Sequence, residues 1–254
     1  MATEPQPQRW AARGWVAAWT AGLALRLWVA WRPLDVLIPK VLSDDAFYYF
    51  RIAENLASGL GPTFDGLRLT NGFHPLWAAL LTALSVAAPQ GQTPIAWALS
   101  LAALMDSVSG TLIYLAVARA LGRRGPATLA ALAYLLHPMA ILEGVNGLET
   151  ALAGLALTGL FAYYVCTLRR RTTYGAYAVF GLLAGLLALA RTDYIFFVVA
   201  LGLERLWQER ARAAPPLLAA AAVCSLVVAP WLVWSRLQVG TWVQTSGLAV
   251  PYVV

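Results

Sequence analysis

Charged residues are scarce in this chain. Only 12% of its 254 residues are Asp, Glu, Lys or Arg, whereas 60% are hydrophobic; a soluble domain carries about 25% charged residues. A single core of this size cannot hide so much apolar surface from water. Disordered chains show the opposite composition, with few apolar residues and many charges. The composition therefore excludes a soluble globular protein and a disordered one, and it leaves a polytopic membrane protein.

Cysteine is also rare, and the familiar nucleotide and metal motifs are missing. Cys166 and Cys224 both lie within apolar runs, where we expect packing rather than a disulfide. The sequence contains no P-loop, dinucleotide fingerprint, HExxH, nucleophile elbow or Cys/His zinc spacing. We therefore expect no nucleotide-dependent site. In a membrane protein the net charge of +6 indicates topology, so we also expect no nucleic-acid partner.

Long apolar runs dominate what is present. They cover 14–31, 73–88, 95–118, 126–143, 148–168, 174–190, 194–207 and 215–235. Nine arginines follow the third, fifth and seventh runs, namely Arg119, Arg123, Arg124, Arg169, Arg170, Arg171, Arg205, Arg210 and Arg212. They face the cytoplasm, as the positive-inside rule requires, only if run 73–88 lies on the outer surface instead of crossing. The sequence thus predicts an all-α protein with seven spans in the cytoplasmic membrane, its N-terminus inside.

This topology divides the chain into three parts. Residues 1–13 are expected to form a cytoplasmic tail, and 14–240 the seven-span membrane module. Within that module, 32–94 is the one long outer loop, with two surface helices. Residues 241–254 begin an outer segment, so we expect a fragment or a short protein.

The acidic pair Asp44–Asp45 is the sharpest feature of the outer loop. It follows Ser43 in LSDDAFYYFRIAENLASG, a stretch that predicts an amphipathic helix at the membrane surface. One interpretation is helix capping, with Ser43 as the cap. The other is catalysis, because a helix N-terminus favours the ionised carboxylate that a general base needs. On the sequence pattern alone, capping and catalysis are about equally favoured.

Other polar residues lie at the predicted outer ends of spans. His74, in TNGFHPLW, either bonds to loop carbonyls or contacts an anionic group at headgroup level. Glu149 either completes a capping box with Asn146 or joins an acidic cluster. Arg191 and Asp193, in ARTDY, either close a turn as an ion pair or provide an arginine for a phosphate.

Two charges fall within predicted spans. Arg26 lies in the first span and Asp106 in the second. Charges at membrane depth are costly and usually face protein. We expect Asp106 to serve in a structural pair with Arg26.

Taken together, these residues resemble a known family. A first span, the acidic pair opening DDAFYYFRIAENLASG and the turn into NGFHPLW are similar to the GT-C integral-membrane glycosyltransferases. More closely, the chain resembles the protein O-mannosyltransferase and lipid A aminoarabinose transferase branch, glycosyltransferase family 39. The turns ARALGRRGPA and ARTDY contribute to the resemblance, which extends over about 14–240.

The resemblance implies a function. Members take a sugar from a polyprenyl-phosphate donor and need no nucleotide sugar. The first acidic residue of the outer loop, here Asp44, would be the general base, and Asp45 would support it. Basic residues would hold the donor phosphate, and these map to His74 and, by position only, to Arg191. Arg51 is the next basic candidate for the phosphate.

The resulting prediction is sugar transfer from the lipid donor to a hydroxyl of a glycan, lipid or protein at the outer face of the membrane. No cofactor is expected, although Asp44, Asp45 and Glu149 are a conceivable site for a divalent metal. A transporter or flippase, with membrane charges along a path, is the first alternative. A non-catalytic membrane scaffold is the second. One outer cavity joining the candidate residues would favour the enzyme, whereas a polar path through Asp106 would favour transport.

Overall fold

The structure is a computed structural model that describes residues 6–87, 93–242 and 244–246. Within these ranges all regular elements are helices, and the β-type pairing consists of one isolated bridge between Thr63 and Leu69. The α-helices are α1 Gln6–Ala30, α2 Leu34–Lys40, α3 Asp44–Ala57, α4 Pro75–Ala87, α5 Thr93–Leu121, α6 Arg124–Leu135, α7 Pro138–Glu143, α8 Thr150–Cys166, α9 Tyr174–Ala190, α10 Ile195–Glu209 and α11 Ala214–Gln238. Short 3₁₀ turns are η1 Leu168–Arg170, η2 Thr192–Tyr194 and η3 Arg210–Arg212.

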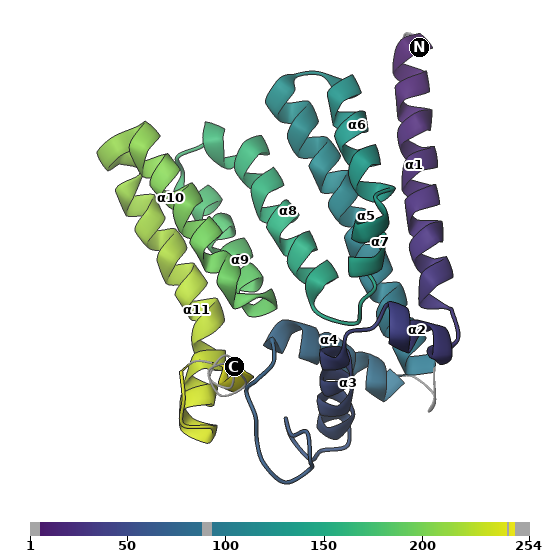
Figure 1. The fold of residues 1–254 in the computed structure, drawn as a ribbon. Coiled ribbons are helices and arrows are strands. Elements are labelled where there is room, and N and C mark those ends of the chain that lie inside the picture. Colours follow the sequence, from purple (N-terminus) through teal and green to yellow (C-terminus); the bar gives the residue numbers. More distant parts are fainter. Residues whose placement is uncertain (1–5, 88–92, 243, 247–254) are drawn as a thin grey trace, which may run out of the picture.

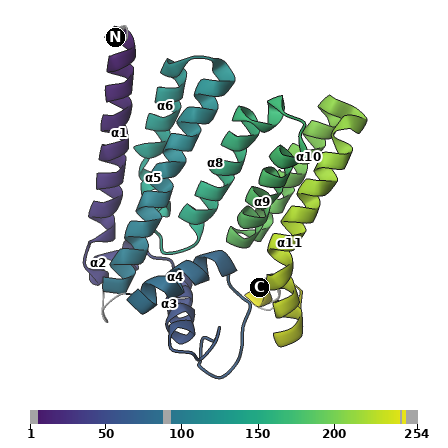
Figure 2. The same ribbon diagram turned by 180° about the vertical axis from the view of Figure 1, so that it is seen from behind.

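The long helices stand side by side (Figure 1). Helix α5 packs against α1, α6 and α8, while α9 packs against α8 and α11. The view from behind shows the same order, with α1 at one edge and α11 at the other (Figure 2). The chain is therefore an all-helical bundle whose neighbouring long helices are mostly connected by short turns.

The two ends of the bundle differ in charge and structure. The turns 121–124, 167–173 and 209–213 lie together with the start of α1, and we call this the arginine end (Figure 1). Helices α2, α3 and α4 and the last turns of α11 lie at the opposite end, which we call the α3 end (Figure 1). The arginines that follow apolar runs thus gather on one side, as the sequence predicted.

Three helical segments are long and apolar enough to cross a membrane. They are Pro94–Leu121, Thr150–Arg170 and Ala214–Gln238. Large apolar side chains on the outside of the bundle fit a lipid environment, since Phe196 is 77% exposed and Leu226 is 73% exposed. The chain is therefore a helical membrane protein by fold.

Two helices differ in extent from the apolar runs of the sequence. Helix α1 begins at Gln6, ahead of the apolar run 14–31, because Gln, Arg and Ala are good helix formers. The rest of the predicted tail, 1–5, lies outside the described residues, as do 88–92, 243 and 247–254. The apolar run 126–143 is also not one helix. It breaks between α6 and α7 at Pro138, which disfavours helical geometry at the preceding residue.

The buried pair Arg26–Asp106 is located next to this break. Arg26 Nε donates to Asp106 Oδ2 at 2.6 Å, and Arg26 Nη1 donates to the Leu135 carbonyl oxygen at 2.7 Å. The Tyr134 hydroxyl donates to Asp106 Oδ1 at 2.5 Å. The last carbonyls of a helix lack helical partners, and Arg26 satisfies one of them at the end of α6. The predicted structural pairing of these two charges is confirmed.

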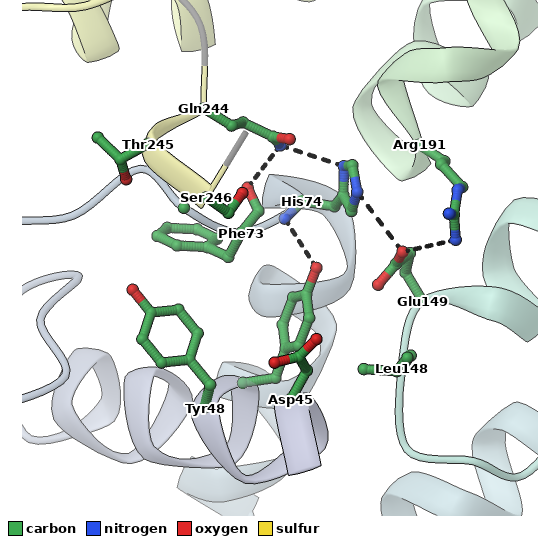
Figure 3. Close-up of a pocket in the computed structure, with 12 residues that line it drawn as sticks. Asp45, Tyr48, Phe73, His74, Leu148, Glu149, Arg191, Gln244, Thr245 and Ser246 are labelled. Atoms are coloured by element: carbon green, nitrogen blue, oxygen red, sulfur yellow. Dashed lines mark hydrogen bonds and ion pairs between the residues drawn. The ribbon is translucent and has the colours of Figure 1, made fainter. Parts of the chain in front are cut away.

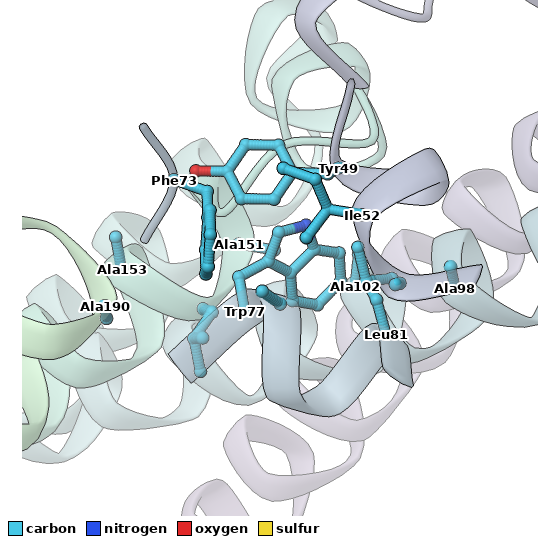
Figure 4. Packing of buried hydrophobic residues seen from close by; sticks show 13 residues of the cluster. Tyr49, Ile52, Phe73, Trp77, Leu81, Ala98, Ala102, Ala151, Ala153 and Ala190 are labelled. Carbon is cyan, nitrogen blue, oxygen red and sulfur yellow. The ribbon is translucent and has the colours of Figure 1, made fainter. Parts of the chain in front are cut away.

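A hydrophobic cluster joins the α3 end to the bundle. Trp77 of α4 lies at its centre, among Tyr49 and Ile52 of α3 and small residues of α5 and α8 (Figure 4). Trp77 and Ile52 are fully buried. This packing fixes α3 and α4 against the bundle and so positions the side chains described next.

Candidate functional site

A cavity of about 600 Å³ opens at the α3 end. Its lining comes from α3, from the segment before α4, from the start of α8, from the α9–α10 turn and from the segment after α11 (Figure 3). The lining residues are Asp45, Tyr48, Tyr49, Gly72, Phe73, His74, Leu148, Glu149, Arg191, Gln244, Thr245 and Ser246. Four of these were predicted from the sequence, namely Asp45, His74, Glu149 and Arg191.

The loop before α8 aims Glu149 at the cavity. Gly147 adopts φ of +85°, a conformation that favours glycine, and an added Cβ would lie 2.6 Å from Ala46 Cβ of α3. The Trp77 indole donates to the Gly147 carbonyl oxygen at 3.1 Å. The backbone therefore passes close against α3 and α4, and Glu149 follows as the N-cap residue of α8.

Glu149 is the centre of the polar network. Its Oε1 atom lies 3.1 Å from Arg191 Nη1 and 3.5 Å from His74 Nε2 (Figure 3). The residue is only 5% exposed, and buried charges in proteins are normally paired in this way. Of the two interpretations of Glu149, the capping box with Asn146 does not form, because Glu149 is itself the N-cap residue of α8 and makes no side-chain cap bond. Asn146 Nδ2 donates to Glu143 and Thr150, and its Oδ1 accepts from the Leu148 backbone N–H.

The pKa values of Tyr49 and His74 are shifted by their surroundings. Burial raises the pKa of the Tyr49 hydroxyl far above its ordinary value, and the negative charge of Glu149 acts in the same direction. The hydroxyl therefore stays protonated while it accepts a hydrogen bond from the His74 backbone N–H at 3.0 Å. Burial lowers the pKa of His74; Glu149 and Asp193 oppose this effect, and Arg191 reinforces it.

The acidic pair opens α3 as predicted, but its two members differ. Asp45 lines the cavity, whereas Asp44, although exposed, is not among the lining residues. Consecutive helix residues point about 100° apart, so one of the pair faces the cavity. Ser43 is the N-cap residue of α3, as predicted, although its hydroxyl makes no cap hydrogen bond.

Arg51 and Asp193 lie away from the centre of the site. Arg51 pairs with Glu54 at 3.3 Å and lines a separate cavity between α3, α4 and α5. Asp193 approaches Arg191 Nε at 3.8 Å, and its side chain is 77% exposed. The structure does not bring Arg51 to the cavity as a second basic group, and Asp193 acts at its edge through its ion pair with Arg191 and its charge effect on His74.

The conceivable metal site receives no support. Among the residues that the structure describes, no three His, Cys, Asp or Glu side chains gather closely enough to hold a metal ion. Asp44 and Asp45 open α3, while Glu149 is engaged with Arg191 and His74. Asp45 and Glu149 line the same cavity, whereas Asp44 is not among its lining residues.

Sequence reasoning missed part of the lining. Tyr49 belongs to the buried face of α3, and only the fold shows its hydroxyl beside His74. Gln244, Thr245 and Ser246 follow the last apolar run, in a segment without a recognisable motif. The polar stretch QTS after an apolar span was the available signal, but its contact with 71–74 depends on tertiary structure.

Comparison of the chain with family models, with curated proteins and with solved structures found no match.

Proposed function

We propose that this chain is a GT-C-type glycosyltransferase that transfers a sugar from a polyprenyl-phosphate donor to an acceptor hydroxyl at the outer face of the cytoplasmic membrane. The observation that carries the proposal is the cavity at the α3 end. It joins an acidic residue of the first loop to His74, Glu149 and Arg191. Asp106, by contrast, is held by Arg26 and Tyr134 inside the bundle, which argues for structure rather than for a transport path.

The proposal includes seven spans, formed by α1, α5, α6–α7, α8, α9, α10 and α11. The arginine end would face the cytoplasm, in accordance with the positive-inside rule. The cavity would then open at the outer headgroup level, where α3 and α4 lie. A lipid-linked donor could reach this position from the bilayer with its phosphate in the cavity.

The reaction needs a base and a site for the leaving phosphate. The acceptor oxygen attacks the anomeric carbon, the bond from that carbon to the phosphate oxygen breaks, and the acceptor proton passes to a carboxylate. The geometry favours Asp45 over Asp44 as this base, because Asp45 lines the cavity. Polyprenyl phosphate leaves with its negative charge, which Arg191 would stabilise. The ion pairs of Arg191 use Nη1 and Nε, so Nη2 is available for a phosphate oxygen.

The first prediction concerns the acidic pair. Asp45→Asn keeps the shape of the side chain but cannot accept the proton, so we expect sugar transfer to fall by roughly 10²–10⁴-fold. Asp44→Asn is the matched variant and should lose much less. The measurement is transfer from labelled polyprenyl-phosphate sugars to added acceptors by the full-length protein in liposomes.

Each outcome of this assay has a meaning. A larger loss in Asp44→Asn would return the direct role to Asp44. Full turnover in both variants would exclude the acidic pair as the base. Movement of the donor between leaflets without sugar transfer would replace the enzyme with a flippase.

The second prediction concerns orientation. Single cysteines at Gly125 and Thr172, at the arginine end, should be labelled from the cytoplasm. A cysteine at Ser58, which ends α3, should be labelled from outside. The background variant has Cys166 and Cys224 replaced by alanine. Labelling of Gly125→Cys or Thr172→Cys by an impermeant reagent in intact cells would contradict the seven-span arrangement.

A further inference from the structure

The segment after α11 folds back onto the loop before α4. Asn71 Nδ2 donates to Thr241 Oγ1 at 3.2 Å, and the Thr245 backbone N–H donates to Asn71 Oδ1 at 3.1 Å. The approach is close at Gly72, where an added Cβ would lie 3.0 Å from Thr245 Oγ1. These contacts join residues about 170 positions apart in the sequence and place Gln244 beside His74.

The Gln244 side chain has two neighbours. Its Nε2 atom lies 2.9 Å from the Phe73 carbonyl oxygen and 3.1 Å from His74 Nδ1 (Figure 3). A carbonyl oxygen can only accept a hydrogen bond, so the amide must present its NH₂ group to Phe73. The NH₂ group carries two donors and no acceptor, and its second hydrogen is directed to His74 Nδ1. That ring nitrogen must therefore be the unprotonated one.

We propose that Gln244 is a positioning residue that holds His74 as the neutral Nε2–H tautomer and directs this N–H at Glu149. His74 Nε2 lies 3.5 Å from Glu149 Oε1, the oxygen that also contacts Arg191. In a neutral imidazole one nitrogen donates and the other accepts, and the partner of one nitrogen sets the role of the other. Gln244 on one side and Glu149 on the other thus define a single tautomer of the His74 ring.

This inference rests on the proposed function and changes the role of His74 within it. A neutral His74 directs its Nε2–H toward Glu149 Oε1, 3.5 Å away, and supplies no positive charge. Arg191 is then the permanent cation among the lining residues of the cavity. The charge that holds the donor phosphate would come from Arg191. His74 would hold the Glu149 carboxylate in place, and that carboxylate in turn orients Arg191.

The other groups around His74 agree with this assignment. Glu149, Asp193 and Arg191 are the charged groups that act on the ring, and the Tyr49 hydroxyl is bonded to the His74 backbone. Burial of His74 lowers its pKa despite the two carboxylates, which keeps the ring neutral near pH 7.

The test is nitrogen NMR of histidine in the chain of 254 residues. This chain has two histidines, so a His137→Gln background leaves His74 as its only histidine signal. At pH 7 in lipid nanodiscs we expect protonated-type nitrogen at Nε2 and unprotonated-type nitrogen at Nδ1. Gln244→Leu removes the donor and should raise the His74 pKa by roughly half to one pH unit, the equivalent of one hydrogen bond. Gln244→Glu presents only acceptors and should move a proton onto Nδ1.

A matched control is Gln238→Leu, the same exchange at the exposed end of α11, which should leave the His74 spectrum unchanged. Protonated Nδ1 in the wild type would overturn the inference. So would an unchanged His74 spectrum in both Gln244 variants, with their thermal midpoints intact. The spectrum does not depend on sugar transfer. Failure of the transfer assay with the expected spectrum would therefore remove the proposed function and leave the role of Gln244 in place.

Discussion

Two arginine–carboxylate ion pairs in this protein have the same chemistry and different surroundings. In the bundle interior, Arg26 is fully buried, and its donors go to Asp106 and to the carbonyl oxygens of Gly22 and Leu135. At the α3 end, Arg191 contacts Glu149, but its side chain is 38% exposed and lines a cavity. The first arginine is enclosed by protein, whereas the second can reach an incoming group.

The comparison shows why an arginine in a membrane protein cannot be interpreted from its residue type alone. Arg26 and Asp106 sit where the helix break at Pro138 leaves a carbonyl oxygen to be satisfied, and Tyr134 completes the set. The pair at the α3 end lies between helix ends, where the backbone leaves space. An arginine enclosed by protein is expected to have a structural role, whereas an arginine that faces a cavity is available to bind a ligand.

The largest effect is expected at the enclosed pair. Arg26→Met leaves the buried Asp106 without its partner, so we expect a loss of about 3–5 kcal/mol of unfolding free energy. Unfolding in detergent, followed by tryptophan fluorescence, measures this loss. The double variant Arg26→Met/Asp106→Asn removes both charges and should recover much of the stability. If Arg26→Met were as stable as the wild type, the pair would not be structural.

Substitution of Arg191 in the cavity should change donor binding instead of stability. Arg191→Lys keeps the charge but loses the planar guanidinium, whose Nη1 and Nε contact Glu149 and Asp193 while Nη2 would contact the phosphate. We expect affinity for a polyprenyl-phosphate sugar to fall roughly 10–100-fold, the loss of one charge-assisted hydrogen bond, with little change in thermal stability. Arg236→Lys, at the exposed end of α11, is the matched control for the same exchange. Unchanged donor binding in Arg191→Lys would place the phosphate elsewhere.

The smallest effect is expected at an exposed pair. Arg51 and Glu54 lie 3.3 Å apart with side chains 53% and 60% exposed, and such surface pairs contribute at most about 1 kcal/mol. Arg51→Ala should therefore change neither unfolding nor donor binding measurably. A clear loss of donor affinity in this variant would restore Arg51 as a phosphate ligand. It would also weaken the difference between the exposed pair and the cavity pair.

Much of the fold follows from sequence patterns. The segment opened by Asp44 and Asp45 forms the predicted helix up to Ala57, and the run from 73 forms α4 at the same end of the bundle. Apolar runs and arginine positions carry this information because each depends on the bilayer rather than on particular neighbours. The break at Pro138 was missed because the run was assigned from its overall hydrophobicity, and the helix-breaking step His137–Pro138 within it was not used.

Less of the site could be predicted. The sequence selected His74, Glu149 and Arg191, which the structure brings together, from their polar character at the ends of apolar runs. It could not distinguish Asp44 from Asp45, since their orientation depends on how α3 packs over Trp77. Arg51 has equal charge and a similar location in the sequence, yet it faces another cavity.

The sequence by itself determined the class of this protein. A chain with 60% hydrophobic residues and 12% charged residues has to place its apolar helices in lipid, and the arginines that follow its third, fifth and seventh apolar runs are expected on one side. Only the tertiary structure decided which polar groups meet. The contacts of Gln244 with His74 and of Arg191 with Glu149 join segments 170 and 42 residues apart. No local pattern encodes such contacts, because they depend on the packing of several helices at once.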